Sequence, residues 1–343
     1  MKLNFNVVAD VNFYAITKTL DTNQDVLIGT NLLMFGTHNV LNVGNQLQQR
    51  SWINLKYIKS PINYIGNKYK LISQIEPLFP RKINKFIDVF GGSGTVLINT
   101  EAEHYIYNDI NPYVSSIFEG LISQSAENTI TQIEDVIKEY SLSMTNKEGF
   151  EKLRDDYNAG RKDWITLYTL MCHSFNHQFR FNNNHEYNSS FGKNRSYFSE
   201  RQRQDLIAMK NKISTDITVM SKSFEDIDFS DFDENDLVYL DPPYYNSVGS
   251  YNDGKRGFEG WTKEHEIKLL ELMTKLHKQG TRFALSNNLK YDNPYLREWL
   301  DNNDFYTIHY LKGDYVNCNR VGQDTLNHFH QNQRSLYLQN SYS

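Results

Sequence analysis

The stretch KFIDVFGGSGTVLINT, residues 85–100, decides the fold. Residues 85–90 form an apolar run that predicts a buried strand, and Thr95 begins a run that predicts a helix. Between them lies Gly91-Gly-Ser-Gly94. A glycine-rich turn from strand to helix lets a ligand approach the backbone closely. The stretch therefore predicts one strand of an α/β sheet with a ligand site at its end.

The glycine turn differs from two common nucleotide motifs. No lysine follows it, so it is not the phosphate loop Gly-x-x-x-x-Gly-Lys-Ser/Thr. The dinucleotide fingerprint is incomplete, because Leu97 stands where the third glycine would follow Gly92 and Gly94. The turn alone leaves the ligand open.

The next predicted strand, residues 105–109, ends in Asp109. Doubly wound folds place an acid there to accept hydrogen bonds from ribose hydroxyls. The alternative is that Asp109 only caps the helix that Pro112 begins. A ribose site without a phosphate loop indicates S-adenosylmethionine. Asn63-Tyr-Ile-Gly-Asn-Lys68 is consistent with it, since Lys68 could pair with the carboxylate of that molecule, although an exposed lysine on a turn is the simpler interpretation.

A second informative stretch is NDLVYLDPPYYNS, residues 235–247. Residues 236–240 predict a buried strand that the two prolines after Asp241 must end. The Asp241 carboxylate and the Pro242 carbonyl offer two fixed acceptors, which would orient an exocyclic amine and stabilise the charge that develops on it during methylation. Tyr244 presents a face on which a planar base could stack, once that base has left its duplex.

The remaining elements alternate between strand and helix after residue 222. Alternation of this kind predicts a mainly parallel α/β sheet. Helices are expected near 262–278 and 294–300, and strands at 281–286, 305–310 and 334–338. We expect an N-terminal extension of unknown role at 1–55, a first part of the α/β domain at 56–114, a mostly helical insertion at 115–222 and the second part of the domain at 223–343.

The composition fits a globular chain of 343 residues, with 39% hydrophobic and 22% charged residues. The 23 Tyr and 20 Phe fit either stacking on flat ligands or a compositional bias. Two cysteines outside any Cys-x-x-Cys pair argue against a disulfide framework, and no third ligand accompanies the pairs His173/His177 and His328/His330, so no metal is expected. No leader or membrane-spanning run is evident, so we expect a soluble cytoplasmic protein with no membrane partner.

Charge is distributed unevenly along a chain whose net charge is −5. Acids dominate residues 223–243, whereas bases are concentrated between Arg180 and Lys212. The stretch 179–192 is polar and rich in turn residues, which predicts a loop or hairpin outside the core. The basic segment fits a nucleic-acid contact, although taken alone a solvated face is the simpler interpretation.

Four stretches occur together in one order: 63–68, 88–94, Tyr107-Asn-Asp109 and Asp241-Pro-Pro-Tyr244. Together they resemble the Dam-type adenine-specific DNA methyltransferases, with their phage and restriction-modification relatives. In that family the glycine motif precedes a target-recognition insertion and Asp-Pro-Pro-Tyr follows it. The stretch from Arg180 to Gly192 is similar to the family's segment at the active-site mouth, with Ser190 in place of a usual proline and Tyr64 in place of a frequent tryptophan.

The resemblance implies a Rossmann-like S-adenosylmethionine-dependent methyltransferase fold with residues 115–222 as the target-recognition domain. The catalytic residues that it implies are Asp241, Pro242 and Tyr244. The cofactor-binding residues that it implies are Tyr64, Lys68, Asp88, Phe90, Gly92, Asp109, Phe224 and Asp241. The DNA-binding residues that it implies are Arg180, Asn182, Asn188, Lys193 and Arg195.

The implied activity is transfer of a methyl group to the N6 amine of adenine in double-stranded DNA, on a base flipped out of the helix. Cytosine-N4 methylation, RNA adenine methylation and a catalytically silent DNA-binding homologue stay open as alternatives. The restriction-modification relatives imply a cognate restriction endonuclease that acts separately on the same site. The family alone implies a short recognition sequence such as GATC, because periodicity does not tell which side chains reach the base edges.

Overall fold

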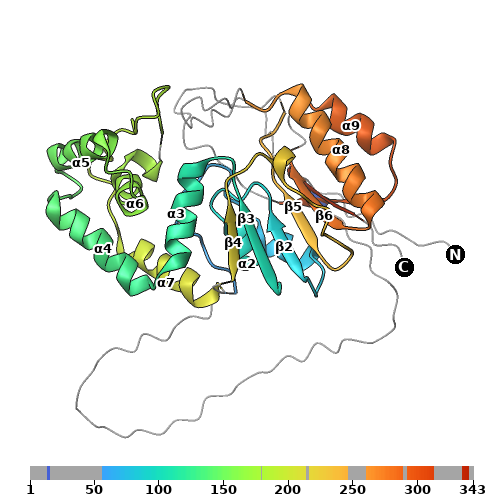
Figure 1. Cartoon of the computed structure of the whole chain (residues 1–343), viewed down its shortest axis with the longest axis horizontal. Helices are drawn as coiled ribbons and strands as arrows, with labels where there is room; N and C mark the ends of the chain where they lie inside the picture. Colours follow the sequence, from blue (N-terminus) through green and yellow to red (C-terminus); the bar gives the residue numbers. More distant parts are fainter. Residues whose placement is uncertain are drawn as a thin grey trace, which may run out of the picture.

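The computed structural model describes residues 14–15, 56–178, 180–213, 216–245, 260–288, 292–312 and 334–339. Of the expected N-terminal extension it describes only the short strand β1 (Tyr14–Ala15). Cys318, His328 and His330 lie outside the described residues. Figure 1 shows a central sheet with helices on both faces and a helical lobe at one side.

The sheet is mainly parallel in its centre, as the sequence predicts. Its strand order is β1-β7-β8-β6-β5-β2-β3-β4. The parallel strands are β2 (Lys85–Asp88), β3 (His104–Asn108), β4 (Ile217–Met220), β5 (Leu237–Leu240) and β6 (Arg282–Asn287). The antiparallel edge consists of β7 (Tyr306–Leu311), β8 (Arg334–Gln339) and β1. The expected α/β fold class is therefore confirmed.

Strand β5 shows why the sheet needs a helical layer on each face. Its four residues Leu237–Leu240 are all buried. Successive side chains of a strand point to opposite faces, and accordingly Leu237 and Tyr239 join one hydrophobic core whereas Val238 and Leu240 join a second. A strand that is apolar at every position is typical of a parallel sheet covered on both sides.

Different helices cover the two faces of the sheet. The first core includes side chains of α1 (Ile72–Ile75), α2 (Thr95–Asn99) and α3 (Pro112–Ser123). The second core includes side chains of α8 (Lys263–Gln279) and α9 (Pro294–Asp301), which lie together at the right of Figure 1. The beginnings of these helices, apart from that of α1, were expected from the sequence within one or two residues.

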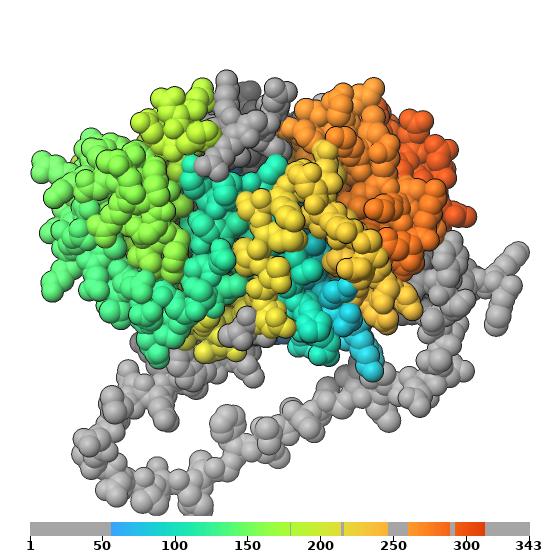
Figure 2. Space-filling model, in the orientation of Figure 1, coloured from blue at the N-terminus to red at the C-terminus, as the bar shows by residue number. Residues whose placement is uncertain are grey.

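The helical lobe is built around one buried helix. It contains α4 (Ala126–Glu139), α5 (Lys147–Ala159), α6 (Trp164–His173) and α7 (Glu200–Lys212). Every residue of α6 after Trp164 is buried, and α3, α4 and α5 pack around it. The space-filling view in Figure 2 shows this green lobe on one side of the sheet and the orange layer of α8 and α9 on the other.

Strand β4 lies within the range 115–222 that the sequence assigned to a helical insertion. It pairs in parallel with β3, from Tyr105 opposite Ile217 to Asn108 opposite Met220. The central sheet therefore extends into that range, and the expected boundary at residue 222 comes after one of its strands. None of the described helices is both long and apolar enough to cross a membrane.

Candidate active site

Three carboxylates meet where three neighbouring strands end. Asp88 is the last residue of β2, Asp109 follows β3 and Asp241 follows β5. These strands lie in the order β5-β2-β3 and run parallel, so their carboxyl ends share one edge of the sheet. Ligands of open α/β sheets bind at this edge.

The glycine turn closes one side of this edge. Gly92 has a φ of +51°, a conformation that side-chain-bearing residues rarely adopt. Its N–H donates to Oδ2 of Asp109 at 2.8 Å, and its carbonyl accepts from the Tyr107 hydroxyl at 2.7 Å. A Cβ atom on Gly92 would lie 2.9 Å from the ring of Tyr64, so glycine is what lets that ring close over the turn.

Asp109 accepts hydrogen bonds from two backbone segments, the glycine turn and the residue that precedes Pro112. Besides the bond from Gly92, its Oδ1 accepts from the N–H of Asn111 at 2.8 Å. The cap of helix α3 is Asn111, whose side chain accepts from the N–H of Tyr113 at 3.0 Å, and Pro112 takes the first helical position. The alternative that Asp109 only caps this helix is therefore wrong, because a neighbour caps it.

Asp88 is buried beneath the glycine turn and is 1% exposed. Its Oδ1 has no hydrogen-bond partner among the residues that the structure describes. Burial, and then the negative charges of Asp241 and Asp109, raise the pKa of Asp88 well above its ordinary value. An unpaired buried oxygen that faces a pocket is a strong position for a donor or cation of a ligand.

Lys68 reaches into the same edge and is 3% exposed. Its Nζ donates to Oδ2 of Asp241 and, at 2.9 Å, to the carbonyl of Gly66. The sequence placed Lys68 towards a cofactor carboxylate, whereas this structure pairs it with the expected catalytic acid. On the other side of that acid, the Tyr244 hydroxyl donates to Oδ1 of Asp241 at 3.5 Å.

The structure brings all the expected catalytic and cofactor-binding residues to one pocket. The predicted residues that line it are Tyr64, Lys68, Asp88, Phe90, Gly92, Asp109, Phe224, Asp241, Pro242 and Tyr244. Lining residues that the sequence analysis missed include Ile110, Trp261 and His265. Ile110 carries a recognisable signal, because it is a large apolar residue, 47% exposed, directly after a strand-ending acid.

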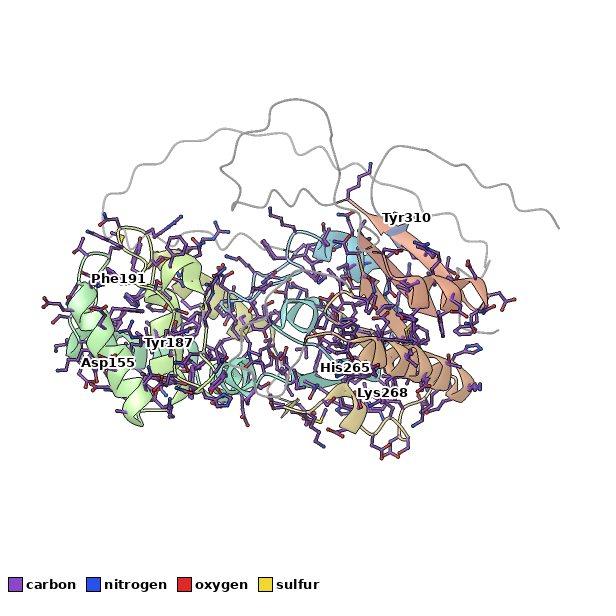
Figure 3. The ribbon with its side chains drawn as sticks, turned by 90° about the horizontal axis from the view of Figure 1, so that it is seen from above. Asp155, Tyr187, Phe191, His265, Lys268 and Tyr310 are labelled. Atoms are coloured by element: carbon purple, nitrogen blue, oxygen red, sulfur yellow. The ribbon has the colours of Figure 1, made fainter. Side chains whose placement is uncertain are left out.

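Aromatic rings form one wall of the pocket. The ring of Phe90 lies 5.6 Å from that of Phe224 and 5.7 Å from that of Trp261, between centroids. Phe224 belongs to the short 3₁₀ helix η3 (Phe224–Asp226). His265, at the beginning of α8, stacks on Trp261 with 5.5 Å between the ring centroids. In Figure 3 His265 and Lys268 lie next to each other on this helix.

The expected DNA-contacting residues lie on a loop of the helical lobe, between η2 (Phe175–His177) and α7. Arg180, Asn188, Lys193 and Arg195 are exposed. Two contacts join this part of the lobe to residues that neighbour the pocket lining: the Asn63 amide donates to the carbonyl of Asn176 in η2 at 2.8 Å, and Phe181 of the loop stacks on Tyr113 of α3 with 3.7 Å between ring centroids.

Asn182 differs from the other members of that group. Its Oδ1 accepts from the N–H groups of Asn184 and Glu186 at 2.9 and 3.0 Å, and its amide donates to the Glu186 carboxylate. The side chain thus holds the turn together. The expectation that this loop lies outside the core is wrong for Phe181 and Tyr187, each 1% exposed. Figure 3 shows Tyr187 and Phe191 in the helical lobe, apart from His265 and Lys268.

Comparison with protein families gives one match that covers most of the chain. The family described as D12 class N6 adenine-specific DNA methyltransferase matches residues 64–316. The match begins at Tyr64 of the pocket and contains all the parallel strands of the sheet. It therefore includes the pocket and the basic loop.

Curated relatives agree with this match. The chain is 46% identical over 265 residues to the type II methyltransferase M.FokI of Planomicrobium okeanokoites, covering 76% of this chain and 40% of the relative. It is 45% identical over 266 residues to the modification methylase StsI of Streptococcus sanguinis, with the same shares of 76% and 40%. A DNA adenine methylase of Haemophilus influenzae is 27% identical over 188 residues, 53% of this chain and 63% of the relative. The chain thus spans about two fifths of the length of the first two relatives.

Proposed function

The chain belongs to the family of D12 class N6 adenine-specific DNA methyltransferases, and from that premise we propose that it methylates the N6 amine of adenine in double-stranded DNA, with S-adenosylmethionine as the methyl donor. The observation that carries the proposal is the position of Asp241, which lies at the end of β5 between Lys68 and Tyr244 in a pocket with two further buried carboxylates. Residues 115–222 would then serve as the target-recognition region.

The charged groups and aromatic rings that line the pocket support S-adenosylmethionine as the cofactor. That molecule supplies an electrophilic methyl group on a sulfonium, and it carries an ammonium, a carboxylate, a ribose and a purine. Oδ1 of Asp88, which has no hydrogen-bond partner among the described residues, would accept from the ammonium. Each oxygen of a carboxylate can accept more than one hydrogen bond, so Asp109 can accept from ribose hydroxyls while it holds Gly92 and Asn111. The wall of Phe90 and Phe224 offers flat faces to the purine.

Asp241 and Pro242 would bind and orient the adenine amine. An amine has two N–H donors, and the Asp241 carboxylate and the Pro242 carbonyl would accept one each. That arrangement turns the nitrogen lone pair towards the methyl group and stabilises the positive charge that develops on the nitrogen. The carboxylate is also the nearest acceptor for the proton that the amine must lose. Because Lys68 occupies Oδ2 of Asp241, the amine has to share or displace that ion pair.

Tyr244 would stack on the flipped base, which contributes roughly 1–3 kcal/mol. This gain offsets the few kcal/mol that extrusion of the base costs. Tyr244 comes three residues after Asp241 on one short loop, so the stacking face and the acceptor are fixed relative to each other. A base held in this way presents its amine edge to Asp241.

Arg180, Lys193 and Arg195 would contact DNA phosphates, which orient the duplex without selecting a sequence. Asn188 is exposed on the same loop and would assist them. We now assign Asn182 to the shape of the loop rather than to direct DNA contact, because its side chain holds the turn. A restriction endonuclease that acts separately on the same site is the expected partner if the chain shares the modification role of the relatives, and the cytoplasm is the expected compartment.

The decisive experiment identifies the modified nucleoside. Duplex DNA and RNA are incubated separately with the protein and isotopically labelled S-adenosylmethionine, digested to nucleosides and separated. We expect N6-methyladenine from duplex DNA. Asp241→Ala should lower the rate by at least about 10²–10³-fold, whereas Asp231→Ala, an exposed acid before β5, should not change it.

The other outcomes each contradict the proposal in a different way. N4-methylcytosine would correct the target base, and label only in RNA would correct the substrate. A protein that gives no product and no heat of binding with S-adenosylmethionine in calorimetry would be a silent DNA-binding homologue. Wild-type activity in Asp241→Ala would contradict the mechanism.

A further inference from the structure

Trp261 lines the pocket immediately before helix α8 begins. Its ring lies 5.7 Å from Phe90 and 5.6 Å from Phe224, and His265 stacks on it. Trp261 thus completes an aromatic wall whose other two large rings, Phe90 and Phe224, were expected from the sequence. The orientation of its indole decides the shape of that wall.

The indole N–H donates to a buried carboxylate. Glu266 is 0% exposed, and its Oε2 accepts from Nε1 of Trp261 while its Oε1 accepts from the Asn293 amide at 2.8 Å. Burial raises the pKa of Glu266, and the two hydrogen bonds act in the opposite direction. Acids are almost never fully buried unless they are paired, so the position of Glu266 requires a specific reason.

The beginning of α8 shows that helix formation is not that reason. Thr262 is the N-cap and forms a capping box with His265, which makes Trp261 the residue before the cap and Glu266 the fourth helical residue. These two positions are the ones that an apolar pair usually occupies, in a contact that fixes how the chain enters a helix. An apolar residue at 266 would serve that purpose without the cost of desolvating a carboxylate. What only an acceptor can do there is accept hydrogen bonds from the indole N–H and from the Asn293 amide.

The second partner of Glu266 fixes the carboxylate itself. Asn293 is the N-cap of α9, and its Oδ1 accepts from the N–H of Leu296 at 3.1 Å while its amide donates to Glu266. Glu266 therefore lies near the beginning of two helices, where the helix dipoles favour an anion. The chain of bonds from Asn293 through Glu266 to Trp261 ties the pocket wall to the α8–α9 layer.

We propose that Glu266 is a positioning residue that holds the Trp261 indole as a wall for the purine of the cofactor. The proposal rests on the proposed function only for the identity of that cofactor. Glu266 does not touch the pocket itself, since it is absent from the pocket lining whereas Trp261 is present. Its effect on ligand binding must therefore act through the indole.

The test measures binding of S-adenosylmethionine to the whole chain by calorimetry. Glu266→Leu keeps the volume but removes the acceptor, and we expect binding about tenfold weaker. Glu266→Gln keeps an acceptor oxygen and should bind within about threefold of wild type. Glu264→Gln changes an exposed acid in the same helical turn and should bind like wild type. A second readout needs no ligand. The fluorescence of each protein minus that of its Trp261→Phe derivative gives the emission of Trp261. Glu266→Leu should shift this emission, whereas Glu264→Gln should not.

A double-mutant cycle separates positioning from a general structural effect. A phenylalanine ring has no N–H to donate, so in the Trp261→Phe background Glu266→Leu should change binding less than about twofold. An equal loss in both backgrounds, or wild-type binding by folded Glu266→Leu, would overturn the proposal. If Glu266→Leu does not fold, Asn293→Ser provides the same test, because serine still caps α9 but lacks the amide that donates to Glu266. Weaker binding and a shifted Trp261 emission in this variant support the proposal, and the absence of both overturns it. No heat with the wild-type protein would instead contradict the cofactor assignment, and the ligand-free fluorescence comparison would then decide whether Glu266 positions the indole.

Discussion

Buried Lys68 forms an ion pair with half-buried Asp241, the acid that directly follows β5, and the two are 173 residues apart in the sequence. Asp88 and Asp109 line the same pocket, so the ammonium of Lys68 offsets part of a concentrated negative charge. Removing the ammonium of Lys68 would leave the Asp241 carboxylate without this partner beside two further acids, which is energetically costly. Lys68 therefore stabilises the acidic pocket electrostatically in the absence of a ligand.

Lys68→Met tests this role. We expect affinity for S-adenosylmethionine to fall by at least about tenfold, because the carboxylate of the ligand would meet three acids without the neighbouring ammonium. Calorimetry gives the affinity, and circular dichroism verifies the fold. Lys70→Met, at an exposed position two residues away, should bind like wild type. Equal affinity of the two variants would show that Lys68 only balances charge inside the protein.

Gly94 provides a test of the glycine turn against a matched position. Gly94 and Gly280 both have positive φ, +70° and +85°, so alanine at either strains the backbone by about 1–2 kcal/mol. A Cβ atom on Gly94 would lie 2.3 Å from the ring of Phe118, whereas no atom of the described residues lies within 4 Å of one on Gly280. Overpacking of a core costs typically a further ~1–3 kcal/mol. Urea unfolding should therefore show a greater loss of stability for Gly94→Ala, and equal losses would contradict the packing described.

The basic loop predicts a change in the salt dependence of DNA binding. Arg180→Ala and Arg195→Ala each remove a cation from an exposed position on the basic loop. Each phosphate contact that is lost should reduce the magnitude of the negative slope of log affinity against log salt concentration by about one. Fluorescence anisotropy with a labelled duplex at several salt concentrations measures the slope. Lys278→Ala, exposed at the far end of α8, is the control and should leave the slope unchanged.

Asn182→Ala should behave differently from the arginine variants. Its side chain holds the turn at Asn184 and Glu186 and carries no charge. We expect weaker DNA binding with an unaltered salt slope, measured in the same titrations. A reduced slope would mean that the turn also positions the cations, and unchanged affinity would mean that the turn has no part in binding.

Residues next to strand ends were predictable, because strand, turn and helix signals follow one another within a few positions. Asp88, Asp109 and Asp241 each follow an apolar run, and the rule that parallel strands end at one edge brings them together. The pairing of Lys68 with Asp241 was not predictable, because nothing in either stretch fixes which acid the lysine reaches.

Three further features escaped sequence analysis for physical reasons. Strand β4 (Ile217–Met220) is a half-exposed edge strand of four residues, so it lacks the continuous apolar run of β5. Phe181 and Tyr187 are buried although their neighbours are polar, because those neighbours point outward from a loop. Glu266 contacts Trp261 within the beginning of α8, but its second partner, Asn293, is 27 residues away, and only the packing of α8 against α9 brings the two together.

His173 links the stability of the helical lobe to pH. It is the last residue of α6 and is 2% exposed, and its Nδ1 donates to the carbonyl of Thr169 at 2.9 Å. Burial lowers the pKa of His173 from 6.5 to about 4. Between these values the unfolded chain binds a proton that the folded chain does not, so stability is lost as the pH falls. Each pH unit in this window is worth about 1.4 kcal/mol, and the whole window therefore about 3 kcal/mol.

His173→Gln removes this titration, and we expect it to flatten the decline in the free energy of unfolding between pH 6.5 and about pH 4. Urea unfolding at several pH values gives the slope for each protein. The comparison uses slopes, so a constant cost of the substitution does not affect it. If His173→Gln keeps the wild-type slope, then burial does not lower the pKa of His173 in the folded protein.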